Sequence, residues 1–174
     1  MLEEIEFDPS QFSLPQEPVR GIDLPDAEAT RRLGASLGKL LESGDFLGLI
    51  GQLGSGKTTL VGGLLEELGS ANAARSPTYT LVNVHETTPP LYHVDLYRLE
   101  DVDDLESIGY WDYVSAADGI LCVEWLDRVP EAWPGQGVIA VLAYRDQGRR
   151  VRLYSSENHR DRIDAIPGTF GGSA

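Results

Sequence analysis

The sequence predicts an α/β protein in which a mixed, partly parallel central sheet lies between layers of helices. Two observations support this prediction. Short apolar runs at 46–50 and 120–124 carry no internal charge, which is typical of strands buried on both faces of a parallel sheet. Segments with helical apolar spacing alternate with these runs, and a predicted β-hairpin at 137–154 adds antiparallel strands near the C-terminus.

The expected elements follow one another without an internal repeat. They are, in order, a strand at 19–24, a helix that begins after the N-cap Asp26 and ends at 43–44, a strand at 46–50, a glycine-rich turn at 51–56, a helix at 57–68, strands at 79–85 and 91–95, an acidic helix at 102–108, a strand at 120–124, and hairpin strands at 137–144 and 149–154. We expect one domain at 19–155. Prolines, charges and glycines dominate the two ends, which predicts a mobile acidic tail at 1–18 and a flexible tail at 156–174.

Composition excludes several classes of function. The 174 residues include 28 acidic and 14 basic side chains, for a net charge of −14. Tight binding to nucleic acid by this chain alone is not expected, because such binding needs lysine and arginine to displace phosphate counterions. Cys122 is the only cysteine, and the acidic N-terminus lacks the pattern of a signal peptide. We therefore expect a cytoplasmic protein without disulfides or a membrane span.

The segment 51–58, Gly-Gln-Leu-Gly-Ser-Gly-Lys-Thr, matches the phosphate-binding pattern G-x-x-x-x-G-K-[ST], or Walker A motif, between a predicted strand and a predicted helix. In such a loop the backbone N–H groups and the helix N-terminus face the phosphates. A glycine-rich turn that merely starts a helix would not explain a lysine in a chain with only two. The sequence therefore predicts a three-layer P-loop NTPase fold whose cofactor-binding residues include Leu53, Gly54, Ser55, Gly56, Lys57, Thr58 and Thr59.

A loop that holds a triphosphate also needs a carboxylate near the magnesium ion, normally at the end of a neighbouring buried strand. Glu124 ends one such strand and Asp95 ends another, so the two acids are rivals for this role. Strands often end in a solvated acid without any metal. We expect Thr58 and Glu124 to bind magnesium, and we expect Lys57, Glu124 and Asp95 to act in catalysis.

The nucleotide is predicted to be ATP, because Lys39 and Lys57 are the only lysines and a guanine-specific Asn-Lys-x-Asp signature is absent. The hydroxyl-rich segment 76–80, with Thr78 as the expected contact, follows the loop helix where nucleotide switches often lie. Spacing alone favours a proline turn for this segment. Arg149 is the expected contact among six arginines at 145–162, a group that more commonly forms a solvated hairpin face.

The remaining candidate side chains are expected to be structural. The three histidines, His85, His93 and His159, have no metal-ligand spacing and no evident nucleophile as a partner. Trp125, directly after Glu124, is expected to pack in the core or in an interface.

Five ordered motifs resemble the TsaE family, the bacterial ATPases of tRNA threonylcarbamoyladenosine biosynthesis. They are G-x-L-G-S-G-K-T-T at 51–59, S-P-T-Y-T-L-V at 76–82, Y-H-V-D-L-Y-R-L at 92–99, L-E-S-I-G-Y at 105–110 and V-E-W at 123–125. The resemblance covers about Pro25 to Leu153. It implies a magnesium-dependent ATPase that works with the proteins TsaD and TsaB, meets tRNA only through these partners, and resets the complex between turnovers by ATP hydrolysis.

Carried over to this chain, the resemblance implies that Lys57 and Thr58 hold phosphate and magnesium, that Glu124 is the magnesium carboxylate and that Asp95 is a second functional acid. It also raises the expectation for the segment 76–80. One position departs from the family pattern, because Gln52 occupies a position that is usually Asp. If that acid positions water or metal, intrinsic hydrolysis is weaker here.

Two other functions remain open. A small-molecule kinase could use the same loop, with the arginines at 145–162 in a lid over an acceptor pocket. A nucleotide-gated binding module with little hydrolysis is the second alternative, and Gln52 makes it conceivable.

Overall fold

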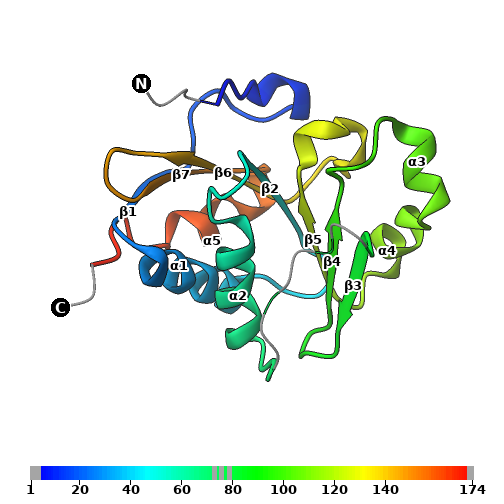
Figure 1. Ribbon diagram of the computed structural model, residues 1–174, viewed down its shortest axis with the longest axis horizontal. Helices are drawn as coiled ribbons and strands as arrows, with labels where there is room; N and C mark the ends of the chain where they lie inside the picture. Colours follow the sequence, from blue (N-terminus) through cyan, green and yellow to red (C-terminus); the bar gives the residue numbers. More distant parts are fainter. Residues whose placement is uncertain (1–4, 72–73, 75–76, 78–79, 172–174) are drawn as a thin grey trace.

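A computed structural model describes residues 5–71, 74, 77 and 80–171, and its fold is built on one seven-stranded sheet (Figure 1). The strands are β1 Arg20–Leu24, β2 Phe46–Gly51, β3 Val82–His85, β4 Leu91–Asp95, β5 Ile120–Glu124, β6 Val138–Tyr144 and β7 Arg149–Ser155, and their order across the sheet is β1-β7-β6-β2-β5-β4-β3. The central strands β6, β2, β5 and β4 are parallel, whereas β1, β7 and β3 pair antiparallel with their neighbours. The predicted mixed sheet and C-terminal hairpin are confirmed.

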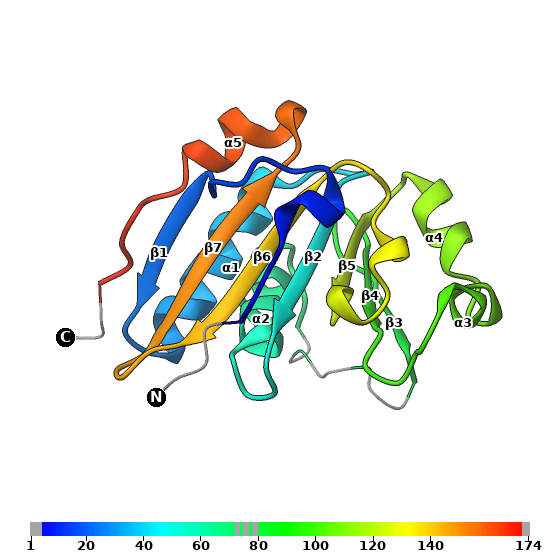
Figure 2. The same ribbon diagram turned by 90° about the horizontal axis from the view of Figure 1, so that it is seen from above.

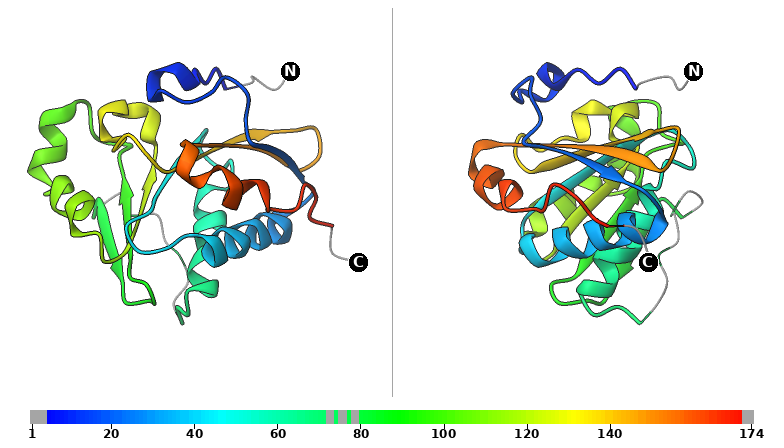
Figure 3. Two further views of the ribbon diagram at one scale, coloured as in Figure 1. Left: turned by 180° about the vertical axis from the view of Figure 1, so that it is seen from behind. Right: turned by 90° about the vertical axis from the view of Figure 1, so that its left-hand side faces the viewer.

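Helices cover both faces of this sheet and complete the three layers (Figures 2 and 3). The helices are α1 Ala27–Leu40, α2 Lys57–Glu67, α3 Val102–Ser107, α4 Tyr110–Ala116 and α5 Arg160–Asp164, with single 3-10 turns at Pro9–Phe12, Leu126–Arg128, Pro130–Ala132 and Glu157–His159. One apolar core lies between the sheet and α1, α2 and α5. A second core lies on the opposite face, under α3, α4 and the N-terminal segment.

The central strand β2 is buried on both faces, which explains why its residues form an uncharged apolar run in the sequence. All six of its residues are buried, because helices or chain segments cover the sheet on both sides. The chain leaves β2 through the glycine-rich loop and enters α2 directly, so this loop lies at the carboxyl end of the parallel strands (Figure 2). That edge is where α/β proteins commonly bind ligands.

Helices α1 and α2 cross at two glycines. A Cβ atom at Gly34 would collide with the backbone carbonyl of Leu60, and one at Gly63 would collide with the carbonyl of Arg31. The helices therefore approach through backbone rather than side chains, which fixes the position of the helix that begins with Lys57. Asp26 starts α1 as expected, since its side chain accepts a hydrogen bond of 2.7 Å from the Ala29 N–H.

The prediction of a mobile acidic tail at 1–18 is wrong for residues 5–14, which pack on the sheet. Phe12 and Leu14 are buried in the second core. The Phe7 ring lies 4.9 Å from that of Tyr154, and Phe12 meets Trp133 edge to face at 6.1 Å. A few apolar residues are enough to hold this segment on the sheet, because each aromatic side chain buries a large area. The sequence did not predict this packing, because isolated apolar residues produce no periodic pattern.

The C-terminal expectation is wrong for residues 156–166, which form a short helix and bury Ile163 and Ile166 in the first core. The acidic helix expected at 102–108 is present as α3, but α4 directly after it was not predicted. Gly109 separates the two with a left-handed φ of 68°, and Tyr110 anchors α4 by burial. Two short helices joined by a glycine lack the repeated spacing that identifies a long one.

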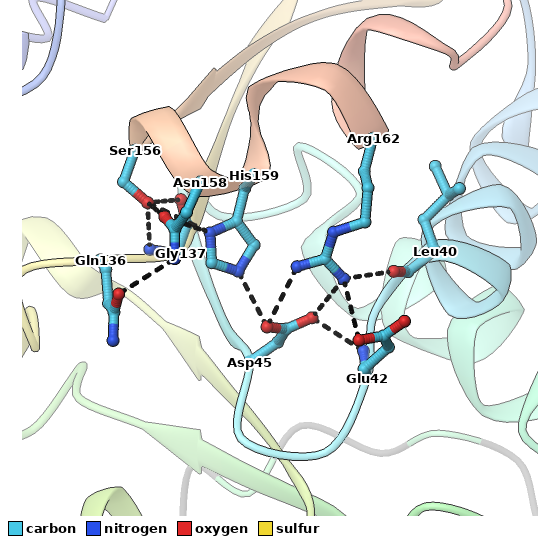
Figure 4. A network of polar contacts seen from close by, with 9 residues as sticks. All are labelled: Leu40, Glu42, Asp45, Gln136, Gly137, Ser156, Asn158, His159 and Arg162. Atoms are coloured by element: carbon cyan, nitrogen blue, oxygen red, sulfur yellow. Dashed lines mark hydrogen bonds and ion pairs between the residues drawn. The ribbon is translucent and has the colours of Figure 1, made fainter.

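A polar network ties the C-terminal segment to the turn before β2 (Figure 4). The Asp45 carboxylate lies 2.8 Å from His159 Nε2 and accepts a hydrogen bond of 2.9 Å from Arg162, which also donates to the Leu40 carbonyl at 2.8 Å. Burial raises the pKa of Asp45, but hydrogen bonds from Arg162, the Glu42 N–H and His159 outweigh it and hold the pKa below the ordinary 3.8.

Replacing Asp45 with asparagine is expected to lower the free energy of unfolding by about 2 kcal/mol near pH 7, because a charge-assisted network is lost. The folded-state pKa of Asp45 is depressed, so its contribution is present above about pH 4 and fades as pH falls further. Thermal unfolding from pH 7 to pH 3 measures the difference. The exposed Asp161→Asn is the control, and a wild-type advantage over Asp45→Asn that grows towards acid pH would contradict the network's role.

Within the described residues, no helix combines the length and the apolar character that a membrane crossing requires.

Candidate nucleotide-binding site

The loop between β2 and α2 has the backbone shape that its glycines permit. Gly54 and Gly56 have φ values of 76° and 106°, in the left-handed region that other residues rarely adopt. A side chain at Gly51 would collide with Ser55 and with the Leu142 carbonyl. These constraints explain why glycine is needed at these positions, and they produce a tight turn whose N–H groups lead into the N-terminus of α2.

Lys57, the first residue of α2, folds back over the loop. Its ammonium donates to the carbonyl of Gly51 at 2.5 Å and to that of Gln52 at 3.0 Å, and it lies 4.0 Å from the centre of the Trp125 ring. Burial lowers the pKa of Lys57, and nearby carboxylates, Glu124 foremost, oppose that shift. A positive charge is thus held inside the loop by carbonyl dipoles and an aromatic face, in a position to exchange these contacts for an anion.

The neighbouring strand ends supply two carboxylates side by side. Asp95 on β4 pairs in register with Glu124 on β5, and both are almost fully buried. Glu124 Oε1 accepts a hydrogen bond of 3.3 Å from the Thr58 hydroxyl, and Oε2 lies 2.7 Å from His93 Nε2. Asp95 Oδ1 instead accepts the Tyr97 N–H at 2.8 Å. Glu124 therefore contacts the first turn of α2, whereas Asp95 holds the backbone that follows β4.

Lys57, Thr58 and Glu124 line one open pocket of about 280 Å³. Its walls are formed by Leu53, Gly54, Gly56, Lys57, Thr58, Thr59, Tyr97, Glu124 and Trp125. Trp125 packs against Tyr97 with ring centroids 4.8 Å apart, and Leu53 at the tip of the loop is 81% exposed. The pocket therefore combines the charged groups of Lys57 and Glu124 with an apolar rim formed by Leu53, Tyr97 and Trp125.

The C-terminal hairpin supports the other side of the loop. Tyr144 donates its hydroxyl proton to the Leu53 carbonyl at 2.5 Å, and Arg149 donates to the Gly54 carbonyl at 3.2 Å. The Arg149 guanidinium also lies 4.3 Å from the centre of the Tyr144 ring. Arg149 therefore contacts the glycine-rich loop itself and holds its outer turn.

The structure brings together most of the predicted site residues. Leu53, Gly54, Gly56, Lys57, Thr58, Thr59 and Glu124 line the pocket, Ser55 is a buried residue of the loop, Asp95 lies beside Glu124, and Arg149 contacts the loop from the hairpin. Thr78 lies outside the described residues. His93, expected to be structural, contacts the candidate metal carboxylate, and Tyr97 and Tyr144 were missed. The two-residue spacing of His93 and Asp95 on one strand was an available signal for the histidine, because alternate residues share a face.

The donor set suits phosphate and magnesium. A carboxylate and a hydroxyl are hard oxygen ligands of the kind that Mg²⁺ prefers, and Mg²⁺ commonly takes only one or two protein ligands and completes its shell with phosphate and water. The described part of the chain holds no group of three or more histidine, cysteine, aspartate or glutamate side chains that could hold a metal. Among the same residues, the loop's own Ser55 Oγ is buried without a hydrogen-bond partner.

The sheet, its two helical layers and the loop between β2 and α2 define an α/β protein with the P-loop fold. A family model described as "Threonylcarbamoyl adenosine biosynthesis protein TsaE" matches residues 24–152. The chain belongs to the TsaE family.

Individual relatives agree with this assignment. The chain is 43% identical over 132 residues to the tRNA threonylcarbamoyladenosine biosynthesis protein TsaE of Nostoc sp.. The aligned region covers 74% of this chain and 81% of the relative. It is 34% identical over 141 residues to the TsaE protein of Haemophilus influenzae, with coverages of 78% and 89%. The crystal structure of Bacillus subtilis YdiB superposes with a TM-score of 0.70 at 26% identity and covers 82% of this chain and 89% of that one.

Proposed function

We propose that this protein is the magnesium-dependent, ATP-binding and ATP-hydrolysing component of the machinery that forms threonylcarbamoyladenosine in tRNA. The observation that supports it best is the convergence of Lys57, Thr58 and Glu124 in one pocket at the carboxyl edge of the sheet. The relatives' names supply the biosynthetic context, and the pocket supplies the chemistry.

Each group has a role that follows from its position. Backbone N–H groups of the loop cradle the phosphates, and the Lys57 ammonium moves from loop carbonyls to phosphate oxygens. Thr58 and Glu124 hold the magnesium ion, which when bound neutralises phosphate charge. Asp95 holds the backbone at Tyr97 and thereby the rim of the pocket. Catalysis is then largely positioning and charge neutralisation.

The partners in this proposal are TsaD and TsaB, with tRNA reached only through them, in the cytoplasm. A net charge of −14 disfavours direct binding to RNA. The exposed Leu53 and the 46% exposed Tyr97 stand at the rim of the pocket, where an apolar partner surface would cover them and exclude water from the nucleotide. We accordingly expect slow hydrolysis alone and stimulation in the complex, where hydrolysis resets the assembly between turnovers.

The test is phosphate release from ATP by the chain alone and with TsaD and TsaB, in magnesium and in excess chelator. The expected result is turnover that requires magnesium, rises with the partners and prefers ATP to GTP. Phosphate transferred to an acceptor instead of water would favour the kinase alternative. Nucleotide binding without turnover, even with both partners, would favour a nucleotide-gated binding module. Gln52, at a position where the family pattern usually has Asp, would agree with that outcome.

A further inference from the structure

His93 makes a contact that the proposed function leaves unexplained. Its ring is fully buried on β4, and its Nε2 atom lies 2.7 Å from Glu124 Oε2. The register of the sheet explains how the His93 ring reaches the Glu124 carboxylate. His93 pairs with Cys122 on β5, two residues before Glu124, so the three side chains face the α2 side together and the imidazole crosses diagonally to the carboxylate.

The contact divides the two oxygens of Glu124 between two partners. Oε1 faces the Thr58 hydroxyl at 3.3 Å, while Oε2 faces the imidazole. A carboxylate that is 2% exposed needs hydrogen bonds to offset its lost hydration. The imidazole supplies one on the side away from the loop, which leaves Oε1 directed towards Thr58 and the pocket.

The polarity of this hydrogen bond follows from the role of Glu124. A carboxylate that ligates magnesium carries no proton, so Nε2–H of His93 is the donor and Oε2 the acceptor. Within the described residues, the second ring nitrogen, Nδ1, has no hydrogen-bond partner, and the neighbouring His85 ring lies 6.2 Å away between centroids. The polar contact of the His93 ring is therefore directed at Glu124.

From this geometry, and resting on the proposed function, we infer that His93 is a positioning residue for magnesium. It holds Glu124 so that Oε1 and the Thr58 hydroxyl present a preformed pair of oxygen ligands. It touches neither nucleotide nor metal. Groups that orient a metal ligand commonly contribute 10-fold to 100-fold to metal affinity, so this order of effect is expected here.

The test compares His93→Gln with His93→Asn. Both are polar and carry an amide donor, but the longer glutamine can place its N–H near the position of Nε2, whereas asparagine falls short of Glu124. Binding of a non-hydrolysable ATP analogue is titrated against magnesium concentration and followed by calorimetry. His85→Gln is the control, because the His85 ring lies beside that of His93 but, among the described residues, makes no hydrogen bond with Glu124. Thermal unfolding verifies that each variant is folded.

The inference predicts that His93→Asn raises the magnesium concentration at half-saturation by about 10-fold or more, while its binding of the analogue in chelator equals that of the wild type. His93→Gln and His85→Gln are expected to remain within about threefold of the wild type. Equal midpoints for the glutamine and asparagine variants, shifted or not, would overturn the inference. A wild-type chain whose binding ignores magnesium would instead contradict the proposed function itself.

Discussion

Replacing Lys57 with alanine is expected to lower partner-stimulated ATP turnover by about 100-fold to 1000-fold, the order seen when one preorganised charge-stabilising donor is removed. Lys57 is 5% exposed and its ammonium lies inside the loop, held by the Gly51 and Gln52 carbonyls. No other lysine can substitute, since the only other one is Lys39 at the end of α1. The measurement is steady-state phosphate release in the presence of both partners.

Lys39→Ala is the matched control, because it removes the same charge from an exposed position. Its turnover is expected to equal that of the wild type. Since burial of Lys57 carries a desolvation cost, Lys57→Ala should unfold at a temperature no lower than the wild type by more than a few degrees. Turnover within about threefold of the wild type in folded Lys57→Ala would show that the reaction occurs elsewhere.

Replacing Gly63 with alanine is expected to lower the free energy of unfolding by about 3 kcal/mol, at the upper end of typical overpacking penalties. A Cβ at this position would meet the Arg31 backbone rather than the end of a flexible side chain, so α1 and α2 must separate. For a domain of this size, the loss corresponds to a fall of about 10 °C in Tm. Calorimetric or circular-dichroism melting measures it.

The adjacent Gly62 provides the control on the same helix. A Cβ there would have only ordinary contacts, with Ala74 Cβ at 3.8 Å and the Arg31 side chain at 3.9 Å. Gly62→Ala is expected to stabilise α2 by up to about 1 kcal/mol, because alanine is a better helix former than glycine. Equal melting temperatures for the two variants would contradict the backbone-to-backbone packing of α1 on α2.

The parts of the fold that the sequence predicted are those with a repeated local signal. Strands β2 and β5 were evident because burial on both faces leaves an unbroken apolar run, and α1 because Asp26 marks its start. The packed ends were not predicted. Phe12 and Ile163 are single anchors whose partners, Trp133 and the first core, lie far away in the sequence, so no local period reveals them.

The residues of the candidate site also fall into those that a local motif predicts and those that only the tertiary structure brings together. Lys57 and Thr58 belong to a contiguous motif whose chemistry is fixed by backbone shape, so the sequence was sufficient to assign them. The contact of Thr58 with Glu124 joins residues 66 positions apart and depends on the parallel pairing of β2 and β5. His93 and Tyr144 enter the site only through the register of β4 and the return of the hairpin to the loop.

This loop and Glu124 are proposed to bind ATP together with magnesium. The most direct measurement is a calorimetric titration of ATP into the wild-type chain, in magnesium and in excess chelator, repeated with Glu124→Gln. We expect one ATP per chain, tighter binding in magnesium, and loss of that magnesium enhancement in Glu124→Gln. Absence of ATP binding by the folded wild type, or a magnesium enhancement that survives unchanged in Glu124→Gln, would contradict it.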